Sequence, residues 1–480
     1  MYRSADYDEP LLNELGVLVK EKPGIPDALP VSLKRKKHVG LPTLDETQVV
    51  RHFHRLSQMN YGVDNGIYPL GSCTMKYNPK LCEEIAKWDS FAFTHPYQDA
   101  SRVQGNLQIL FELERMLCEI TGMGYFCLQP AAGAQGEFLG MLLTRAYHDH
   151  NDEKDRTEVI LPDTAHGTNP ASVTTAGYSL IEIPSTKEGT VDLSMLDKAL
   201  SEKTACFMLT NPNTLGIFES DILEISKMVH KAGALLYYDG ANMNAIMGEA
   251  RPGDMGFDIV HLNLHKTFST PHGGGGPGGG PVGVKIKLEK FLPLPRLGKT
   301  KDDKYFLDYD APESIGKIKS FYGNFSVLLK AYIYVLMMGH DGLKEVSENA
   351  VLNANYMKKK ILDSGMYDMP YKELRKHEFV LSCEKLKKEK GIRAVDVAKR
   401  LLDYGLHPPT VYFPLIVKEA LMVEPTESES KKDLDSYIDA LIKIAGEKPE
   451  VVKNAPSNSP VKRVDEVNAS KNPVLTWKMI

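Results

Sequence analysis

Two residues with complementary chemistry each follow a predicted strand, and the two strands are consecutive. Asp239 ends the apolar run in ALLYYDGANMN, and Lys266 follows the run Ile259–Leu262 in HLNLHKTF. A right-handed crossover between parallel strands would place both strand ends at the same edge of a sheet. A carboxylate and an amine there suit pyridoxal phosphate: Lys266 would form its Schiff base, and Asp239 would keep its pyridine nitrogen protonated, so that the ring acts as an electron sink. A structural ion pair, or two unrelated solvated charges, is the alternative.

Three small or polar residues form a candidate site for the phosphate of this cofactor. Gly133, Ala134 and Gln135 follow the predicted strand Tyr125–Leu128, and a predicted helix, Gln135–Tyr147, begins there. Small residues let the backbone approach a ligand closely, and a helix N-terminus offers unpaired N–H groups and a partial positive charge. Because an ordinary strand–helix turn would have a similar sequence, the loop indicates phosphate binding only in combination with the other residues.

Three further residues are candidates for contacts with the same cofactor. His166, after the strand in EVILPD, would stack on the cofactor ring and exchange protons near the substrate; a hydrogen-bonded turn residue is the alternative. His265 would donate a hydrogen bond to the phosphate, and Thr214, in LTNPNTLG, would reach the 3′ oxygen of the cofactor. Polar residues thus follow several successive strands, which indicates a single site assembled from many loops.

Short β-rich runs alternate with helical segments between residues 125 and 286, which is the pattern of βαβ units. Helices are predicted at 135–147, 193–203 and 222–232. Continuous apolar strands such as ALLYY fit a sheet that is buried on both faces. The predicted fold class is therefore α/β, with a mostly parallel seven-stranded sheet. Its strands are predicted at Tyr125–Leu128, Glu158–Leu161, Ser179–Ile183, Ala205–Leu209, Ala234–Tyr238, Ile259–Leu262 and Val282–Ile286.

Changes of composition along the chain predict four regions. Residues 1–75, rich in Pro and charge, predict an N-terminal arm with short helices, and residues 76–330 predict a large cofactor-binding domain. Helical spacing at Val327–Met338 and Leu343–Leu362, followed by a strand at Phe379–Ser382, predicts a smaller α+β domain over residues 331–447. Residues 448–480 predict a polar C-terminal tail that wraps over a surface or is partly mobile.

The remaining motifs are a glycine-rich run and two His-x-His pairs. The run PHGGGGPGGGP, at 271–281, holds seven of the 38 glycines. It has neither the Lys of a Walker A loop nor the setting of a dinucleotide fingerprint, so we expect backbone that passes close to a ligand or partner, where any Cβ would clash; a flexible linker is the alternative. The pairs His52/His54 and His148/His150 lie at no predicted strand end and beside no Cys pair, so we expect solvated helix faces and no metal site.

The composition excludes several classes of function. The 58 basic and 63 acidic side chains leave a formal charge of -5, which argues against a nucleic-acid or anionic-membrane binder. The six cysteines include no CxxC pair, so reduced thiols are expected. The N-terminus lacks the apolar segment of a signal peptide, and the longest apolar stretch, Ala331–Gly339, is far shorter than the ~20 residues of a membrane span. We therefore expect a cytoplasmic protein of two or three domains.

Six segments of the chain are specific enough to indicate a family. They are PLGSCTMKYNP at Pro69–Pro79, QPAAGAQGE at Gln129–Glu137, DTAHGTNPAS at Asp163–Ser172, DGANMN at Asp239–Asn244, HLNLHKTFSTPHGGGGPGGG at His261–Gly280 and MVEPTESE at Met422–Glu429. In these segments the chain resembles glycine decarboxylase, the P-protein of the glycine cleavage system. The resemblance is to its C-terminal, catalytic half, which in some organisms is a separate chain called subunit 2 of glycine dehydrogenase (decarboxylating).

The resemblance implies a fold-type I pyridoxal-phosphate enzyme, an oxidoreductase that acts on the CH-NH2 group of glycine. It implies Lys266 as the Schiff-base lysine, Asp239 at the pyridine nitrogen, His166 on the ring, and the Gly133–Gln135 loop at the phosphate. The implied reaction is decarboxylation of glycine, with transfer of the aminomethyl group to the lipoyl arm of the H-protein. Because single-chain members of the family carry a further, cofactor-free half, the resemblance also implies a separate subunit 1 and an α2β2 assembly.

Three alternatives remain open at this point: another fold-type I amino-acid decarboxylase, an aminotransferase, and a non-catalytic, partner-binding subunit. The joint presence of Lys266, Asp239 and His166 argues against the last of these. The group that binds the substrate carboxylate stays open, because residues 407–429 contain no Arg, the usual carboxylate clamp of fold-type I enzymes.

Overall fold

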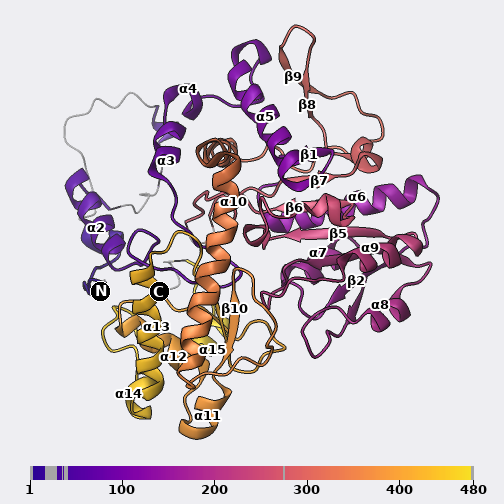
Figure 1. Ribbon diagram of the computed structural model, residues 1–480. Helices are drawn as coiled ribbons and strands as arrows, with labels where there is room; N and C mark the ends of the chain where they lie inside the picture. Colours follow the sequence, from indigo (N-terminus) through magenta and orange to yellow (C-terminus); the bar gives the residue numbers. More distant parts are fainter. Residues whose placement is uncertain (1–3, 17–29, 35, 37–41, 274–275, 477–480) are drawn as a thin grey trace.

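The computed structural model describes residues 4–16, 30–34, 36, 42–273 and 276–476 (Figure 1). Parts of the predicted N-terminal arm, two glycines of the 271–281 run and the last four residues lie outside the described residues.

The largest element is a seven-stranded sheet with the strand order β1-β7-β6-β5-β4-β2-β3. The five strands from β6 to β3 pair in parallel, whereas β7 pairs antiparallel with both β6 and β1. All seven strands predicted from the sequence are present, and the mostly parallel α/β class is confirmed. The strands are β1 (Tyr125–Cys127), β2 (Glu158–Pro162), β3 (Ser179–Ile183), β4 (Thr204–Thr210), β5 (Leu235–Gly240), β6 (Ile259–Leu262) and β7 (Val282–Val284).

Helices cover both faces of this sheet, and each face has its own hydrophobic core. Successive side chains of a strand point to opposite faces, so Leu209 of β4 packs in one core with α5 and α9, while Met208 packs in the other with α6 and α7. Both residues are almost fully buried, which explains why the central strands are continuously apolar. The helices are α5 (Gln104–Thr121), α6 (Gly133–His150), α7 (Thr168–Thr175), α8 (Leu193–Ala199) and α9 (Ile222–Lys231).

The connection after β7 contains a hairpin that the sequence pattern does not predict. Its strands, β8 (Arg296–Lys299) and β9 (Tyr305–Asp308), pair antiparallel. Leu297 and Leu307 pack against the core that contains α5. The two strands are short, partly exposed and rich in charge, so the alternation of apolar and polar residues that marks a strand is weak here.

A long helix, α10 (Phe325–Asp363), connects the large sheet with the C-terminal part of the chain (Figure 1). The sequence predicts two helices here, Val327–Met338 and Leu343–Leu362. The helix is in fact broken between them, because Gly339 has a non-helical backbone with φ of 61°. Only glycine adopts this conformation without strain, so the break follows from the residue type.

The C-terminal part contains a second, three-stranded antiparallel sheet with the order β10-β12-β11. Its strands are β10 (Phe379–Ser382), β11 (Thr410–Val411) and β12 (Ala420–Val423). Four helices and the C-terminal half of α10 enclose a separate hydrophobic core beside it. These helices are α11 (Glu384–Lys390), α12 (Ala394–Asp403), α13 (Lys431–Gly446) and α14 (Pro449–Lys453).

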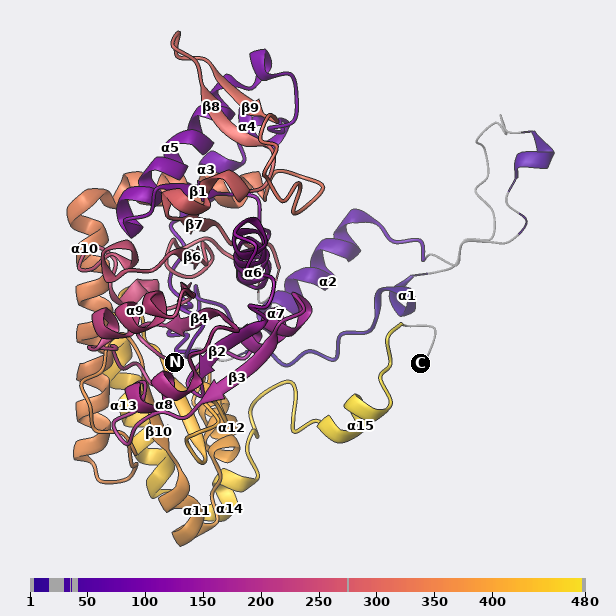
Figure 2. The ribbon, with the colours of Figure 1, turned by 90° about the vertical axis from the view of Figure 1, so that its right-hand side faces the viewer.

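The N-terminal segment reaches into this region and joins the second sheet. Leu70 forms an isolated antiparallel bridge with Val423, next to β12. Figure 2 shows α1, α2 and the C-terminal helix α15 on the side of the molecule opposite α10. The domain limits given above stay predictions. The remaining helices are α1 (Leu12–Leu15), α2 (Glu46–Gln58), α3 (Lys80–Ala86), α4 (Asp89–Ala92) and α15 (Glu466–Lys471).

Two expectations from the composition concern the whole chain. All six cysteines are free thiols, and Cys82, Cys127, Cys206 and Cys383 are buried, as predicted. Among the helices of the described residues, none is both long enough and apolar enough to cross a membrane.

Candidate active site

The candidate residues gather at the edge of the large sheet where the parallel strands end. Asp239 lies near the end of β5 and pairs in register with His261 of the neighbouring parallel strand β6. Lys266 lies four positions beyond the end of β6, in a turn closed by a hydrogen bond from its N–H to the carbonyl of Asn263. Because β5 and β6 are parallel neighbours, Asp239 and Lys266 lie at the same edge of the sheet, as predicted.

The carboxylate of Asp239 is fully buried and bound by four groups. His166 Nδ1 lies 2.7 Å from Oδ2, which also accepts hydrogen bonds from Thr210 Oγ1 at 3.0 Å and Asn169 Nδ2 at 3.1 Å. Oδ1 accepts a hydrogen bond from the N–H of Ala241 at 3.0 Å. An ionised carboxylate can only accept, so His166 must carry a proton on Nδ1. The structure thus joins two predicted cofactor residues, Asp239 and His166, directly.

This environment keeps Asp239 ionised. Burial alone would raise its pKa, but the nearby charges of His166 and His261, together with the hydrogen bonds from His166 and Ala241, hold the pKa well below its usual range. His261 Nε2 lies 3.4 Å from Asp239 Oδ1. A buried carboxylate that stays charged can hold a proton on a facing ring nitrogen, which is the role predicted for Asp239.

The side chain of Lys266 is available for chemistry. Within the part of the chain that the structure describes, its amino group has no hydrogen-bond or ion-pair partner, although it is partly buried. Its positive charge acts on neighbouring groups. One of them is the Cys73 thiol, whose pKa is raised by burial and lowered in part by the charge of Lys266. An unpaired amine at the strand ends is what covalent attachment of a carbonyl compound needs.

The predicted phosphate loop lies at the N-terminus of α6, which begins at Gly133. The Gln135 side chain is occupied inside the loop: its Oε1 accepts a hydrogen bond from the N–H of Ala131 at 2.7 Å, and its Nε2 donates to the carbonyl of Ile318 at 3.2 Å. Gln135 therefore shapes the loop with its side chain, and only the backbone N–H groups of Gly133, Ala134 and Gln135 are left to bind an anion.

The glycine-rich run packs against this loop. A Cβ on Gly280 would lie 2.0 Å from the carbonyl oxygen of Ala132, and the Gly280 N–H donates to the carbonyl of Pro130 at 3.0 Å. A Cβ on Gly133 would in turn lie 2.1 Å from Asn263 Nδ2. The expected close approach is therefore present at Gly280, and the partner there is the chain's own loop.

The two remaining predicted residues lie close to this site. Burial, with a further contribution from the charge of Lys266, lowers the pKa of His265 to about 3, so its imidazole is neutral and able to donate one hydrogen bond. The hydroxyl of Thr214 donates to the carbonyl of Thr164 at 2.8 Å, in the loop that leads to His166. Its proton is thus engaged, and the contact predicted between Thr214 and the 3′ oxygen stays a prediction.

Within the described residues, several buried polar atoms of this site and of the loop after β6 have no hydrogen-bond partner. A buried polar group normally has a partner, so such a cluster indicates a polar ligand. A ring with a hydroxyl group and a phosphate, as in pyridoxal phosphate, would supply partners for atoms of this kind, and the residues present therefore fit that cofactor. The atoms are His166 Nε2, Asn169 Oδ1, His265 Nδ1, Thr267 Oγ1 and Thr270 Oγ1.

A cleft of about 850 Å³ lies between the N-terminal segment and the loop after β6, where His265, the neighbour of Lys266 in the chain, lines it. Tyr68, Thr74, Lys76, His265 and Thr270 are among the residues that line it. This volume lies within the range of about 300–1,000 Å³ typical of small-molecule sites.

Sequence reasoning missed several residues of this site. Thr210, Asn169 and His261 surround Asp239, yet each looks like an ordinary strand or helix residue when read along the chain. Asn169 and His261 lie in segments that carry the family resemblance, which is the one signal that could have found them. Thr74, which lines the cleft, lies in another of these segments and was missed in the same way.

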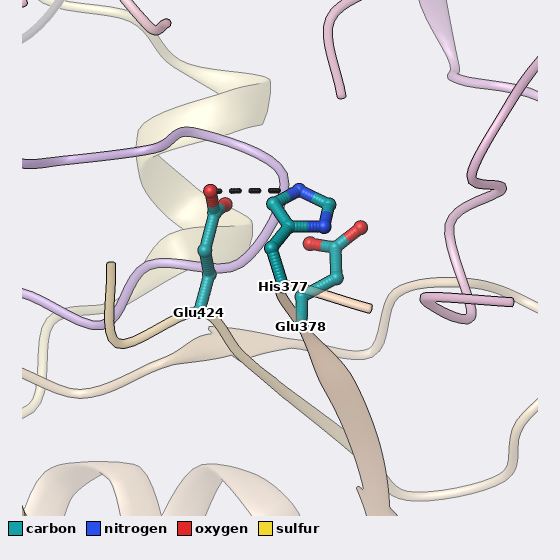
Figure 3. Close-up of side chains that lie close together, drawn as sticks. All are labelled: His377, Glu378 and Glu424. Atoms are coloured by element: carbon teal, nitrogen blue, oxygen red, sulfur yellow. Dashed lines mark ion pairs between the residues drawn. The ribbon is translucent and has the colours of Figure 1, made fainter. Parts of the chain in front are cut away.

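The expectation of solvated histidine pairs is wrong for one histidine in each pair. His52 is buried, with Nδ1 2.8 Å from Glu9 Oε1, and His148 is buried between Glu153 and the carbonyl of Ala205. Each of these two histidines lies on the side of its helix that faces the protein interior, where a carboxylate forms a hydrogen bond with the imidazole. Among the described residues, one group has the donor atoms of a metal site, with atoms within 4.8 Å of one another: His377, Glu378 and Glu424 (Figure 3).

Solved structures define the class of fold. The chain is similar to a crystal structure of glycine decarboxylase (P-protein) of the glycine cleavage system, with a TM-score of 0.72, 21% sequence identity, and coverage of 87% of this chain and 93% of that chain. It is also similar to glutamate decarboxylase of Lactobacillus brevis, with a TM-score of 0.65 and 14% identity over 90% and 97% of the two chains. At such identities the likeness concerns the fold, and it confirms fold type I.

Sequence comparisons then identify the family. The model of the glycine cleavage system P-protein matches residues 8–310, and that of the glycine dehydrogenase C-terminal domain matches residues 346–464. A protein of Pyrococcus horikoshii named probable glycine dehydrogenase (decarboxylating) subunit 2 is 60% identical over 100% of this chain and 98% of its own length. One of the same name from Caldanaerobacter subterraneus is 59% identical over 96% and 94%. The chain belongs to the glycine cleavage system P-protein family.

Proposed function

We propose that the chain is the catalytic subunit of a glycine dehydrogenase (decarboxylating), which removes CO2 from glycine and transfers the remaining aminomethyl group to the lipoyl arm of the H-protein. Membership of the P-protein family supports this activity, as do the full-length relatives named subunit 2. The observation that carries the proposal is the buried Asp239–His166 pair beside the unpaired amine of Lys266. The alternatives of another decarboxylase, an aminotransferase or a non-catalytic subunit are not favoured by these relatives.

Eight residues would hold pyridoxal phosphate. When bound, this cofactor accepts the electron pair that is released as the carboxylate of glycine leaves as CO2. The residues are Lys266 for covalent attachment, Asp239 at the ring nitrogen, His166 on the ring, the loop of Gly133, Ala134 and Gln135 with His265 at the phosphate, and Thr214 at the 3′ oxygen.

The chain's own residues have three tasks in this reaction. Asp239, kept ionised by its surroundings, would hold a proton on the ring nitrogen of the bound cofactor. His166, oriented by its bond to Asp239, presents Nε2 as a site that can accept or return a proton. The loop after β6 positions Lys266, since Thr267 and Phe268, which directly follow it, are fully buried. Each task follows from geometry that is fixed before a substrate arrives.

The proposal includes partners. A subunit 1 would complete the catalytic unit, and the lipoylated H-protein would deliver its arm through the cleft lined by Tyr68, Lys76 and His265. The α2β2 stoichiometry and the cytoplasmic location expected from the sequence stay predictions.

One experiment tests the activity directly. The chain is co-expressed with the candidate subunit 1, purified, and assayed for exchange of labelled bicarbonate into the carboxyl group of glycine. We expect exchange that requires both the H-protein and subunit 1 and is lost in Lys266→Ala. Efficient transamination by the isolated chain, or exchange that persists in Lys266→Ala, would contradict the proposal.

A further inference from the structure

Three ionisable side chains meet behind Lys266. His377 and Glu378 directly precede β10, and Glu424 directly follows β12; these strands pair antiparallel with Phe379 opposite Val423. The register therefore brings Glu378 and Glu424 together, and all three side chains are fully buried. Figure 3 shows the imidazole of His377 standing between the two carboxyl groups.

In the part of the chain that the structure describes, the hydrogen-bond donors to the carboxyl groups of Glu378 and Glu424 are all uncharged. Glu378 accepts from the N–H of Ser72 at 2.9 Å and from Asn242 Nδ2 at 3.1 Å. Glu424 accepts from the N–H of Thr74 at 3.0 Å and from the hydroxyl of the same residue at 2.5 Å. Ser72 and Thr74 hold left-handed backbones, with φ of 66° and 48°, so the N-terminal segment is fixed in an unfavourable conformation against these carboxyl groups.

The buried charges around the three residues do not balance if both carboxyl groups are ionised. Lys266 is the cation that acts on both of them, whereas the nearby Glu427 is already paired with Lys76. His166 and Cys73 are the other titratable groups that act on this cluster. Two buried carboxylates with one cation leave an uncompensated negative charge, which is costly, so one proton should be retained between them.

The pKa directions agree with this count. Burial, and then repulsion from Glu424, raises the pKa of Glu378 well above its usual range, and burial raises that of Glu424 less strongly. Burial, helped by the charge of Lys266, lowers the pKa of His377 to about 3, so its imidazole is neutral.

The position of the proton follows from His377. A neutral imidazole has one donor and one acceptor nitrogen. Among the described residues, neither nitrogen of His377 has a hydrogen-bond partner, and Nε2 lies 3.6 Å from Glu424 Oε1. An acceptor nitrogen placed between two carboxyl groups needs a protonated carboxyl group as its donor. A small closure would give Glu378 O–H donating to one nitrogen, and the N–H of the other donating to Glu424.

We propose that Glu378, His377 and Glu424 form a buried proton relay that keeps one proton and one negative charge beside Lys266 and exchanges a proton with its amino group. In the exchange, an N–H bond of the Lys266 ammonium breaks, its electron pair stays on nitrogen, and the proton forms an O–H bond on Glu424. No electrons are transferred, and the reverse step restores the ammonium. The role of the amine rests on the proposed function, whereas the shared proton does not.

The shared proton is tested on the full-length chain freed of cofactor, by infrared spectroscopy with ¹³C-labelled glutamate. A protonated carboxyl group has a carbonyl band that a carboxylate lacks. At pH 8.5, above the pKa of about 7 of Glu114 and Glu429, we expect a carboxylic acid band that disappears in Glu378→Gln and also in Glu424→Gln, because the remaining partner ionises beside Lys266. Glu219→Gln, a buried glutamate elsewhere with a raised pKa, is the control and should retain this band.

Three results would overturn the relay. The first is the absence of the carboxylic acid band in the unmodified chain. The second is that each variant removes a different part of the band, which would mean that each glutamate carries its own proton. The third is that the unmodified chain retains one equivalent of Zn²⁺ or Mn²⁺ and Glu424→Gln does not. The last result would make the cluster a metal centre. Glycine exchange does not enter this measurement, so failure of the proposed function and failure of the relay can be distinguished.

The electrostatic coupling with Lys266 has its own test in the pH dependence of covalent loading with pyridoxal phosphate. Each single variant keeps one negative charge near Lys266, because the remaining glutamate ionises, so loading should change little. The double variant Glu378→Gln/Glu424→Gln removes that charge, so loading should move to lower pH by about one unit or more. A large shift in either single variant, or no shift in the double variant, would show that the cluster does not act on the amine in this way.

Discussion

The substitution Asp239→Asn tests the central assignment of the site, because it removes a charge and almost no volume. The structure defines what the amide would meet. Its oxygen can replace Oδ1, which accepts the N–H of Ala241 at 3.0 Å. Its NH2 group would then face Asn169 Nδ2 at 3.1 Å, where two donors oppose each other, and it would no longer accept from His166 and Thr210.

Two magnitudes follow from this geometry. Loss of the carboxylate leaves buried donors unpaired, which should cost about 1–3 kcal/mol of folding free energy. Without its charge the facing ring nitrogen no longer stays protonated, and loss of such a preorganised interaction typically lowers the rate on the order of 10²–10³-fold. Lys266 and the phosphate loop are untouched, so the variant should still bind pyridoxal phosphate.

The assay compares three readouts: cofactor content from absorbance, glycine–bicarbonate exchange with the H-protein and subunit 1, and thermal denaturation. Asp258→Asn is the matched control. Asp258 is also a buried carboxylate with a lowered pKa, but it lies at the start of β6, at the other edge of the sheet, and binds His230 and Lys287. It should lose stability and retain exchange per folded molecule. Exchange close to the unmodified rate in Asp239→Asn would refute the role assigned to its charge.

Three further predictions concern attachment, the phosphate loop and acid stability. Lys266→Ala should bind no cofactor covalently, so borohydride reduction should leave no label on the protein. Gly280→Ala should weaken cofactor binding, because its Cβ would lie 2.0 Å from the Ala132 oxygen, whereas Gly446→Ala, with open space around it, should not; equilibrium dialysis measures both. Burial lowers the pKa of His407 from 6.5 to about 4, so this residue takes up its proton more readily when unfolded, and stability should fall as the pH drops from 6.5 to 4, by at most about 3 kcal/mol. Denaturant unfolding of His407→Gln should show a shallower loss over that range.

The large sheet could be predicted from the sequence because its strands are short, apolar on both faces and separated by helices of the right length. Burial on both sides leaves a strong, local signal, as in β4 and β5, where every residue is buried. The hairpin of β8 and β9 could not be predicted for the opposite reason. Its residues are partly exposed and charged, so nothing in the local pattern distinguishes it from a loop.

The residues of the candidate site also fall into those that could be predicted from the sequence and those that could not. Residues that follow a strand, such as Asp239 and Lys266, could be predicted, because the edge where parallel strands end is known before the structure is. Their partners could not. Thr210 contacts Asp239 only because β4 and β5 pair with these two residues in register, and sequence reading does not provide register. Gln135 shows a subtler limit: its place in the phosphate loop was predicted, but its side chain binds the loop's own backbone.

The N-terminal segment explains why reading the strand ends alone gives an incomplete site. Gly71 donates its N–H to the carbonyl of Met422, and Ser72 and Thr74 bind the carboxyl groups of Glu378 and Glu424. A few residues further on, Asn78 donates to the carbonyl of Ser269, in the loop that carries Lys266. The segment from Gly71 to Asn78 thus connects the second sheet with this loop, although neither strand ends nor periodicity mark it. Because these contacts help to hold the left-handed backbones of Ser72 and Thr74, the charge state of the two glutamates and the position of the segment should depend on each other. The surroundings of Lys266 therefore depend on the large sheet and also on the packing of the N-terminal segment against the second sheet.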